Sequence, residues 1–205
     1  LEPTGLRRIV AHKGALRGVI TTEGVSCHSS MPERGRNAIA AMVESLGHLA
    51  VAGRDLEQRR DALLGHPTFQ VTVIQGGGSI NTIPDRCEAR FDLRLVPGLD
   101  PAEALDHLRG RCGCAAIHEI FAAPALAPAD PKAGTGERFL AALRAAGVDR
   151  GQDIAAYCTD AAFLQAQGPC VVWGPGRIED AHTADEGIDL DELDQASEAI
   201  ERFLA

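Results

Sequence analysis

The chain has 205 residues, 45% of them hydrophobic, which suits one large or two small domains with a buried core and argues against disorder. Its formal net charge of −9 disfavours nucleic acid and anionic membrane surfaces as partners, because phosphate binding needs a basic face. No apolar run reaches the roughly 18 residues of a membrane helix, no signal peptide is recognisable and the six cysteines lack CxxC spacing, so we expect reduced thiols and a cytoplasmic location.

The first expected elements are a strand and a helix. Residues 14–25 are rich in Leu, Val, Ile and Thr, which favours a strand pair or one long strand, and a loop rich in Ser, Pro and Gly follows. Asn37 is a good N-cap for a helix that should end at Gly53, and a second, charged helix is expected over residues 55–64. The apolar residues at helical spacing in the first helix are Ile39, Met42, Val43, Leu46 and Leu49.

Two strands, a helix and a third strand are expected next. Residues 68–75 favour a strand that the glycines at 76–78 interrupt, and residues 87–96 alternate between apolar and charged side chains. Asp100 should cap the following helix, after which a strand runs to about residue 122. The order over residues 14–122 is therefore β-α-β-β-α-β, a split βαβ (ferredoxin-like) arrangement with two helices on one sheet face and Arg94 on the other.

The remainder of the chain has a different pattern. A Pro/Ala/Gly-rich linker over residues 121–136 is followed by alternating helices and strands, with strands expected near residues 154–157 and 169–173 and a helix over 161–167. Asp189 and Glu192 form a capping box for the last helix. This alternation predicts an α/β domain with a mostly parallel sheet, but two short strands are too few to form a stable sheet by themselves.

Several well-known catalytic motifs are absent from the sequence. The stretch from Gly77 to Asn81 lacks the last glycine of a GxSxG nucleophile elbow, and there is no Walker loop, no GxGxxG after a strand and no HExxH. Nucleotide binding and hydrolysis by a serine nucleophile therefore have little support. A serine hydrolase with His182 as its base remains a minor alternative.

Five polar residues stand where ligands are often bound, although each also has an ordinary structural explanation. His182 lies in a Gly/Pro-rich loop after a buried strand, where it is either a metal ligand or a solvated histidine. Thr159 opens a helix, as a ligand-binding residue or a plain N-cap. His28 lies in a loop, where it could simply be a solvated histidine. Asn81 follows three glycines and could be an ordinary turn asparagine. Arg94 ends a polar strand face and could be a solvated charge.

Taken together and in order, seven segments resemble one family, the co-catalytic zinc hydrolases that include acetylornithine deacetylase, succinyl-diaminopimelate desuccinylase, aminoacylase and glutamate carboxypeptidase. Each segment is loosely defined alone, but jointly they span the chain. They are EPTG (2–5), VAHKG (10–14), a GxxxHSSxP run (24–32), GRNAI (35–39), QGGGSINTIPDRCEARFDLRLVPG (75–98), TDA (159–161) and VVWGPGRIEDAHTADE (171–186).

The resemblance implies a metallopeptidase-like α/β catalytic domain interrupted by a smaller lid and dimerisation domain. Residues 1–13 would end the N-terminal part of the catalytic domain, residues 14–122 would form the split-βαβ lid, and residues 123–205 would complete the catalytic domain. A homodimer through the lid is expected.

The resemblance also assigns roles to individual residues. Glu2 and His182 would ligate one metal each, and His28 would be the catalytic lid histidine that reaches the partner subunit's active site and stabilises the oxyanion. The expected substrate-binding residues are Asn81, Arg94, Thr159 and Gly176, and the forked guanidinium of Arg94 suits a substrate carboxylate.

One departure from the family pattern is large. The family's HxD pair, bridging aspartate and Glu-Glu pair, which contains the general base, should precede EPTG and are not in this sequence. We therefore expect the chain to be the C-terminal part of a longer protein and inactive alone, with an incomplete site for the two divalent metals (zinc, cobalt or manganese).

The activity implied for the longer protein is hydrolysis of the amide bond of N-acyl amino acids or dipeptides by a metal-activated water, in arginine or lysine biosynthesis. A non-catalytic dimerisation or binding module with the same fold, and a dipeptidase or carboxypeptidase of the same family, remain alternatives.

Overall fold

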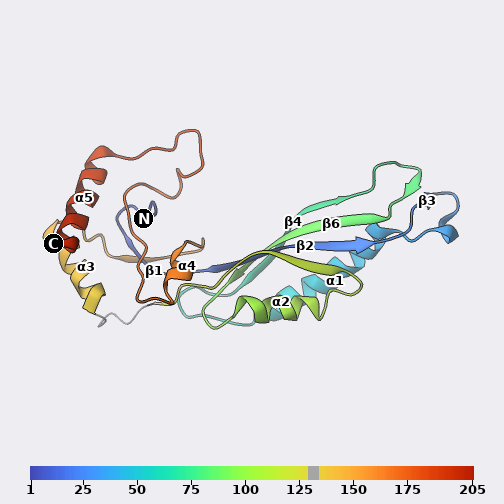
Figure 1. Cartoon of the computed structure of the whole chain (residues 1–205), viewed down its shortest axis with the longest axis horizontal. Coiled ribbons are helices and arrows are strands. Elements are labelled where there is room, and N and C mark those ends of the chain that lie inside the picture. Colours follow the sequence, from blue (N-terminus) through green and yellow to red (C-terminus); the bar gives the residue numbers. More distant parts are fainter. Residues whose placement is uncertain (129–133) are drawn as a thin grey trace. The chain divides into compact units, whose positions relative to one another are not determined.

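The computed structural model describes residues 1–128 and 134–205. The chain forms two compact units (Figure 1). The insert unit is Lys13–Ala125, and the flanking unit combines Leu1–His12 with Leu126–Ala205. The expected α/β class is confirmed. The linker expected over residues 121–136 falls partly outside the described residues, and its first residues belong to a strand that ends at Ala123.

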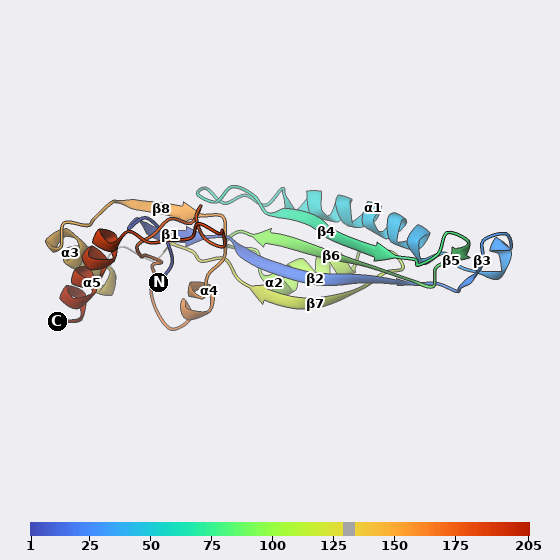
Figure 2. The same ribbon diagram turned by 90° about the horizontal axis from the view of Figure 1, so that it is seen from above.

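The insert unit is built on a four-stranded antiparallel sheet with the order β4-β6-β2-β7. The strands are β2 (Gly14–Glu23), β4 (Thr68–Gly76), β6 (Arg86–Leu95) and β7 (Ala116–Ala123), and helices α1 (Ala38–Leu56) and α2 (Pro101–Arg109) cover one face (Figure 1). The elements follow the predicted β-α-β-β-α-β order. A short ribbon of β3 (Cys27–His28) and β5 (Thr82–Ile83), with the 3-10 turn η1 (Pro32–Arg34), extends from the end of the sheet (Figure 2).

Strand β6 shows why this sheet folds with one face inward. Its apolar residues are buried and its charged residues are half-buried or exposed, as the alternation predicts. The helices start where expected, because the side chains of Asn37 and Asp100 accept hydrogen bonds from the first free backbone N–H groups of α1 and α2. The core between sheet and helices includes Leu16, Ile20, Met42, Leu49, Phe91, Leu93, Leu105 and Leu108.

Two predictions for the region after α1 were wrong. The helix does not end at Gly53 but continues to Leu56, and Gly53 packs so closely on strand β4 that an added Cβ would lie 2.9 Å from the Phe69 Cβ. The second helix over residues 55–64 does not form. The Asp61 carboxylate instead accepts the backbone N–H groups of Leu63 and Leu64, at 2.9 and 2.8 Å, and this local turn competes with a helix.

The flanking unit contains less regular structure. Strands β1 (Arg8–His12) and β8 (Gln152–Ala155) pair in parallel, and the helices are α3 (Gly134–Ala145), α4 (Ala161–Leu164) and α5 (Leu190–Leu204). The strand expected over residues 169–173 is reduced to an antiparallel bridge between Val172 and Ile9. The helix expected over 161–167 is also shorter than predicted.

The hydrophobic cores of the flanking unit are small. One surrounds Trp173, whose indole ring meets the ring of Phe139 edge-on at a centroid distance of 5.6 Å. The other lies between β1 and β8 and includes Ile9, Ala155 and Val172. Over the described residues, no helix is both long and apolar enough to cross a membrane.

Candidate functional site

The seven residues predicted for the site fall into three places. Two lie at the end of the insert unit that carries the β3–β5 ribbon, one lies at the opposite end of the same sheet, and four lie in the flanking unit. They are, in that order, His28 and Asn81; Arg94; and Glu2, Thr159, Gly176 and His182.

The ribbon brings His28 and Asn81 together. His28 in β3 lies opposite Thr82 in β5, and the backbone N–H of Ser29 donates to the Asn81 carbonyl at 2.9 Å. The Ser30 backbone N–H donates to His28 Nδ1 at 3.2 Å. Ser30 Oγ also lies 2.8 Å from Nδ1, and in the neutral tautomer in which Nδ1 accepts from Ser30 the ring carries its proton on Nε2, which is then its hydrogen-bond donor.

The Asn81 side chain is oriented by a neighbouring hydroxyl. Ser79 Oγ donates to Asn81 Oδ1 at 2.6 Å, so the amide nitrogen is the group that remains to donate to a ligand. An open pocket of about 280 Å³ lies beside the ribbon. It is lined by Ser26, Gly77, Gly78, Ser79, Thr82, Pro84, Asp85 and Arg86.

Arg94 is held by its neighbour on the same strand. Its Nε and Nη2 donate to the two carboxylate oxygens of Asp92 at 2.6 and 3.2 Å, and Asp92 also accepts from Arg17 at 2.8 Å. Burial lowers the pKa of Lys13, and the nearby charge of Arg94 lowers it further. Lys13 Nζ donates to the His66 carbonyl at 2.6 Å. Two arginines therefore share the Asp92 carboxylate and the Lys13 ammonium lies near Arg94, an arrangement suited to an additional anion.

The two ends of the insert sheet are far apart. Arg94 pairs with Ala15 near the start of β2, whereas the ribbon leaves the sheet after Glu23, the last residue of β2. Eight residues of strand at about 3.3 Å each span about 26 Å. Arg94 therefore cannot contact the same small molecule as His28 and Asn81 of its own insert unit.

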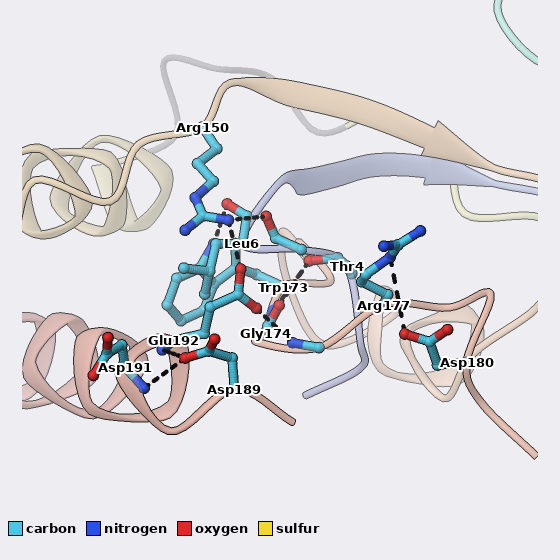
Figure 3. Close-up of polar contacts among 12 residues, drawn as sticks. Thr4, Leu6, Arg150, Trp173, Gly174, Arg177, Asp180, Asp189, Asp191 and Glu192 are labelled. Atoms are coloured by element: carbon cyan, nitrogen blue, oxygen red, sulfur yellow. Dashed lines mark hydrogen bonds and ion pairs between the residues drawn. The ribbon is translucent and has the colours of Figure 1, made fainter. Parts of the chain in front are cut away.

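In the flanking unit, the EPTG and WGPG segments are paired although 170 residues separate Thr4 from Gly174. Thr4 Oγ1 donates to the Gly174 carbonyl and accepts from its N–H, both at 3.1 Å (Figure 3). The Gly5 N–H donates to the Gly176 carbonyl at 2.6 Å. A Cβ on Gly174 would lie 2.6 Å from the Glu2 carbonyl oxygen, so this close approach requires glycine.

Two charged side chains that sequence reasoning missed reinforce this pairing. Glu192 Oε2 accepts the Gly176 N–H at 3.0 Å, and Oε1 accepts from Arg150 Nη1 at 2.6 Å. The Gly176 N–H, followed by Arg150, lowers the pKa of Glu192. The capping box predicted for α5 is thus only half formed, because Asp189 caps the helix while the Glu192 carboxylate binds elsewhere. The acidic position was visible in the sequence, but its partners were not.

His182 lies in the loop that follows the WGPG segment. Its backbone has a left-handed φ of 63°, its N–H donates to Glu186 Oε2 at 2.9 Å, and its ring is exposed. Burial raises the pKa of Tyr157 in the flanking unit. The negative charges of Glu2, Asp153 and Glu179 raise it further. Glu2 and the acidic start of the His182 loop therefore act on one phenol.

Thr159 is buried and its hydroxyl has two partners inside the unit. Thr159 Oγ1 lies 3.0 Å from Nε2 of His12, which is fully buried, and accepts the Ala161 N–H at 3.2 Å. The Asp160 side chain makes no capping bond to α4, whereas the Thr159 hydroxyl does accept an N–H group of the helix. His12 is a third residue that sequence reasoning missed, although the VAHKG segment contains it.

The donor set of the described residues does not fit a complete metal centre. Among residues 1–128 and 134–205, no three side chains of His, Cys, Asp or Glu are placed to hold one ion together. Structural and catalytic zinc sites use three or four protein ligands, and the resemblance supplies only Glu2 and His182 here.

Comparisons with known proteins agree with the geometry of the insert unit. Residues 10–118 match the family model described as the peptidase dimerisation domain. Curated acetylornithine deacetylases of Proteus mirabilis and Photorhabdus laumondii are 35% and 36% identical to the chain over 99% of its length. The match covers 54% of each relative, so the chain spans about half the length of the curated relatives it matches.

Solved structures show the same fold. An aminopeptidase of Bacillus cereus superposes with a TM-score of 0.71 at 17% identity, over 99% of this chain and 54% of that one. An M20 family metallo-carboxypeptidase of Sulfolobus solfataricus superposes with a TM-score of 0.70 at 18% identity, over 99% of this chain and 62% of that one. At such low identities the likeness concerns the fold alone.

Proposed function

Because the chain belongs to the M20 peptidase family, we propose that it is the lid and C-terminal part of a metal-dependent hydrolase that cleaves the amide bond of N-acyl amino acids. The observation that carries the proposal is the match to acetylornithine deacetylases over 99% of the chain at 35% and 36% identity. The substrate type is that of an acetylornithine deacetylase or a desuccinylase, which would place the protein in arginine or lysine biosynthesis.

The flanking unit would contribute two metal ligands and part of the substrate pocket. The EPTG–WGPG pairing supports this assignment, because it places Glu2 against the segment that carries Gly176 and leads to His182. Thr159 and Gly176 would contact substrate. Two divalent metals, zinc or alternatively cobalt or manganese, would be held by Glu2, His182 and ligands that the family carries before the EPTG motif. When bound, they supply an activated water.

The insert unit would contribute His28, Asn81 and Arg94. His28 Nε2–H and the Asn81 amide nitrogen are donors suited to the oxygen that becomes negative in the tetrahedral intermediate. Arg94, together with Lys13, suits a substrate carboxylate. Since about 26 Å of strand separates the two groups, they would serve different sites of the dimer, and the resemblance implies that His28 serves the partner subunit's site.

A homodimer would form through the β4 edge of the insert sheet. Strand β4 ends the strand order, and its residues from Gln70 onward are exposed, including the apolar Val71, Val73 and Ile74. Exposed apolar residues on a sheet edge mark a surface that pairs with another chain. Val43 of α1 is 62% exposed and adds to the apolar surface of the unit.

We further propose that the 205-residue chain is inactive alone and acts in the cytoplasm. The first point rests on the resemblance, which assigns the general base and most metal ligands to sequence before the EPTG motif. The second rests on the sequence, in which six cysteines are scattered without CxxC spacing.

The test is a substrate panel on the complete protein with added zinc. N-acetylornithine should be hydrolysed faster than N-succinyl amino acids and dipeptides, and the 205-residue chain alone should release no acetate. A preference for dipeptides would favour a peptidase of the same family. No hydrolysis of any panel member by a zinc-loaded protein would contradict the proposal.

A second candidate is a non-catalytic dimerisation module, which the match of residues 10–118 to the peptidase dimerisation domain favours. Metal analysis of the complete protein separates the two candidates. About two metals per subunit are expected for the co-catalytic enzyme and none for the module.

A further inference from the structure

We propose that Glu192, together with Arg150, is a positioning residue that holds the loop carrying Gly176 against the segment carrying Glu2. The inference rests on the proposed function for the roles of Gly176 and Glu2, but its geometry does not depend on that function. Glu192 would act through the backbone of the loop and not by touching substrate.

The geometry is a closed ring of hydrogen bonds around Glu192. Its Oε2 accepts the Gly176 N–H at 3.0 Å, and its Oε1 accepts from Arg150 Nη1 at 2.6 Å. Arg150 Nη1 also donates to the Gly5 carbonyl oxygen at 3.4 Å. The ring closes with the Gly5 N–H, which donates to the Gly176 carbonyl oxygen at 2.6 Å. Figure 3 shows Arg150 and Glu192 facing each other beside Leu6 and Trp173. Both backbone groups of Gly176 are thus fixed.

This ring requires a carboxylate at position 192. Both oxygens accept at the same time from N–H donors, and bonds to a charged acceptor are stronger than neutral ones. A glutamine has one acceptor oxygen, so its amide group would turn an N–H toward either Arg150 or the Gly176 N–H. Gly176 adopts a φ of +86°, which glycine reaches without steric cost. Because glycine also has access to many other backbone conformations, bonds to its N–H and C=O groups are needed to hold this one.

Helix α5 does not need the Glu192 side chain. The Asp189 carboxylate accepts the N–H groups of Asp191 and Glu192, at 2.8 and 3.4 Å, and caps the helix. The Glu192 carboxylate in the first turn is therefore available for the loop, and the positive end of the helix also favours its charge. Substitution of Glu192 should leave α5 folded.

The first test uses amide hydrogen exchange followed by NMR on the 205-residue chain. In Glu192→Gln, the Gly176 and Gly5 amides should exchange at least about tenfold faster, because a bond to a charged acceptor is lost, while the amides of α5 keep their protection. Glu198→Gln is the matched control, since Glu198 lies on the same helix and pairs only with Arg202 in the described structure. Unchanged exchange at Gly176 in Glu192→Gln, or the same change in Glu198→Gln, would overturn the proposal.

The second test is kinetic and uses the complete protein. Glu192→Gln should raise KM for the N-acyl amino acid about tenfold with kcat changed less than about threefold, because a displaced loop weakens substrate binding. A purely structural role predicts a lower Tm with unchanged KM, and that result would contradict the proposal. If the wild-type protein hydrolyses no substrate, the proposed function fails, while the exchange experiment still decides the role of Glu192.

Discussion

The two units of the chain are stabilised by different kinds of contact. The insert unit has a four-stranded sheet, two capped helices and one continuous apolar core. The flanking unit has a two-stranded sheet and two small clusters, and its motif segments are joined by the EPTG–WGPG pairing and the Arg150–Glu192 pair. Burial therefore defines the insert unit, whereas specific polar contacts define the loops of the flanking unit.

The largest expected effect separates the two units. Trp173 is 2% exposed, and Trp173→Ala removes its contact with Phe139 and its bond to the Leu6 carbonyl, which should cost about 3–5 kcal/mol. Hydrogen exchange should show lost protection in the flanking unit and retained protection in the insert unit. Phe91→Ala, in the core of the insert unit, should give the reverse pattern. Loss of protection throughout the chain in both variants would show that the units are not independent.

A second variant tests the close approach of the motif segments. In Gly174→Ala the new Cβ meets the Glu2 carbonyl oxygen, which belongs to the backbone and cannot rotate away, so the free energy of unfolding should fall by about 1–3 kcal/mol. Gly136→Ala is the control, because a Cβ there meets nothing within 4 Å and lies in helix α3, where alanine is favoured. Urea unfolding measures the free energy of unfolding of both variants. Equal stability of Gly174→Ala and wild type would show that the two segments are not in contact.

A third prediction concerns pH. The folded-state pKa of Glu192 is lowered below its ordinary value of 4.5 by the Gly176 N–H and Arg150. Its contribution to stability is therefore fully present well above pH 4.5 and is lost as the pH falls through the folded-state pKa. The stability difference between wild type and Glu192→Gln, measured by urea unfolding, should be largest at pH 7 and shrink toward pH 3. A difference that is constant with pH would mean that the carboxylate charge is not involved.

A substitution at the β4 edge should have the smallest effect on the free energy of unfolding. Its effect on the strength of the dimer should be large. Ile74 is 52% exposed, so Ile74→Lys should change the free energy of unfolding by less than about 0.5 kcal/mol. The charge on the edge should nevertheless weaken the dimer, as light scattering over a range of concentrations would show. Ile120→Lys, on the opposite edge strand β7, is the control. Equal dimer strength in Ile74→Lys and wild type would rule out the β4 edge.

The sequence predicted the insert unit better than the flanking unit for a physical reason. Alternation in β6 and the caps Asn37 and Asp100 are local signals, and they act locally in the structure. The helix end predicted at Gly53 was wrong because this glycine allows close contact with Phe69, which is distant in sequence. The strand expected over residues 169–173 forms one bridge, and beyond it the backbone of Gly174 bonds to the EPTG segment, which is distant in sequence.

The candidate site shows the same limit. Motif resemblance selected residues that the structure places in three groups, and it could not show that Arg94 is bound by Asp92 or that Thr159 contacts His12. Glu192 and Arg150 lie 42 residues apart, and nothing in either local sequence indicates the other. The roles of the seven predicted residues remain proposals that rest on the resemblance and on the geometry of each group.

The most direct test of the account is complementation between two variants of the complete protein. Once the wild type is shown to hydrolyse N-acetylornithine, His28→Ala and Arg94→Ala should each lose activity. If each site uses Arg94 of its own subunit and His28 of the partner, mixing and reassembling the two variants should restore about a quarter of wild-type activity, because half of the dimers then hold one intact site. No recovery on mixing, with heterodimers verified by mass spectrometry, would contradict the account.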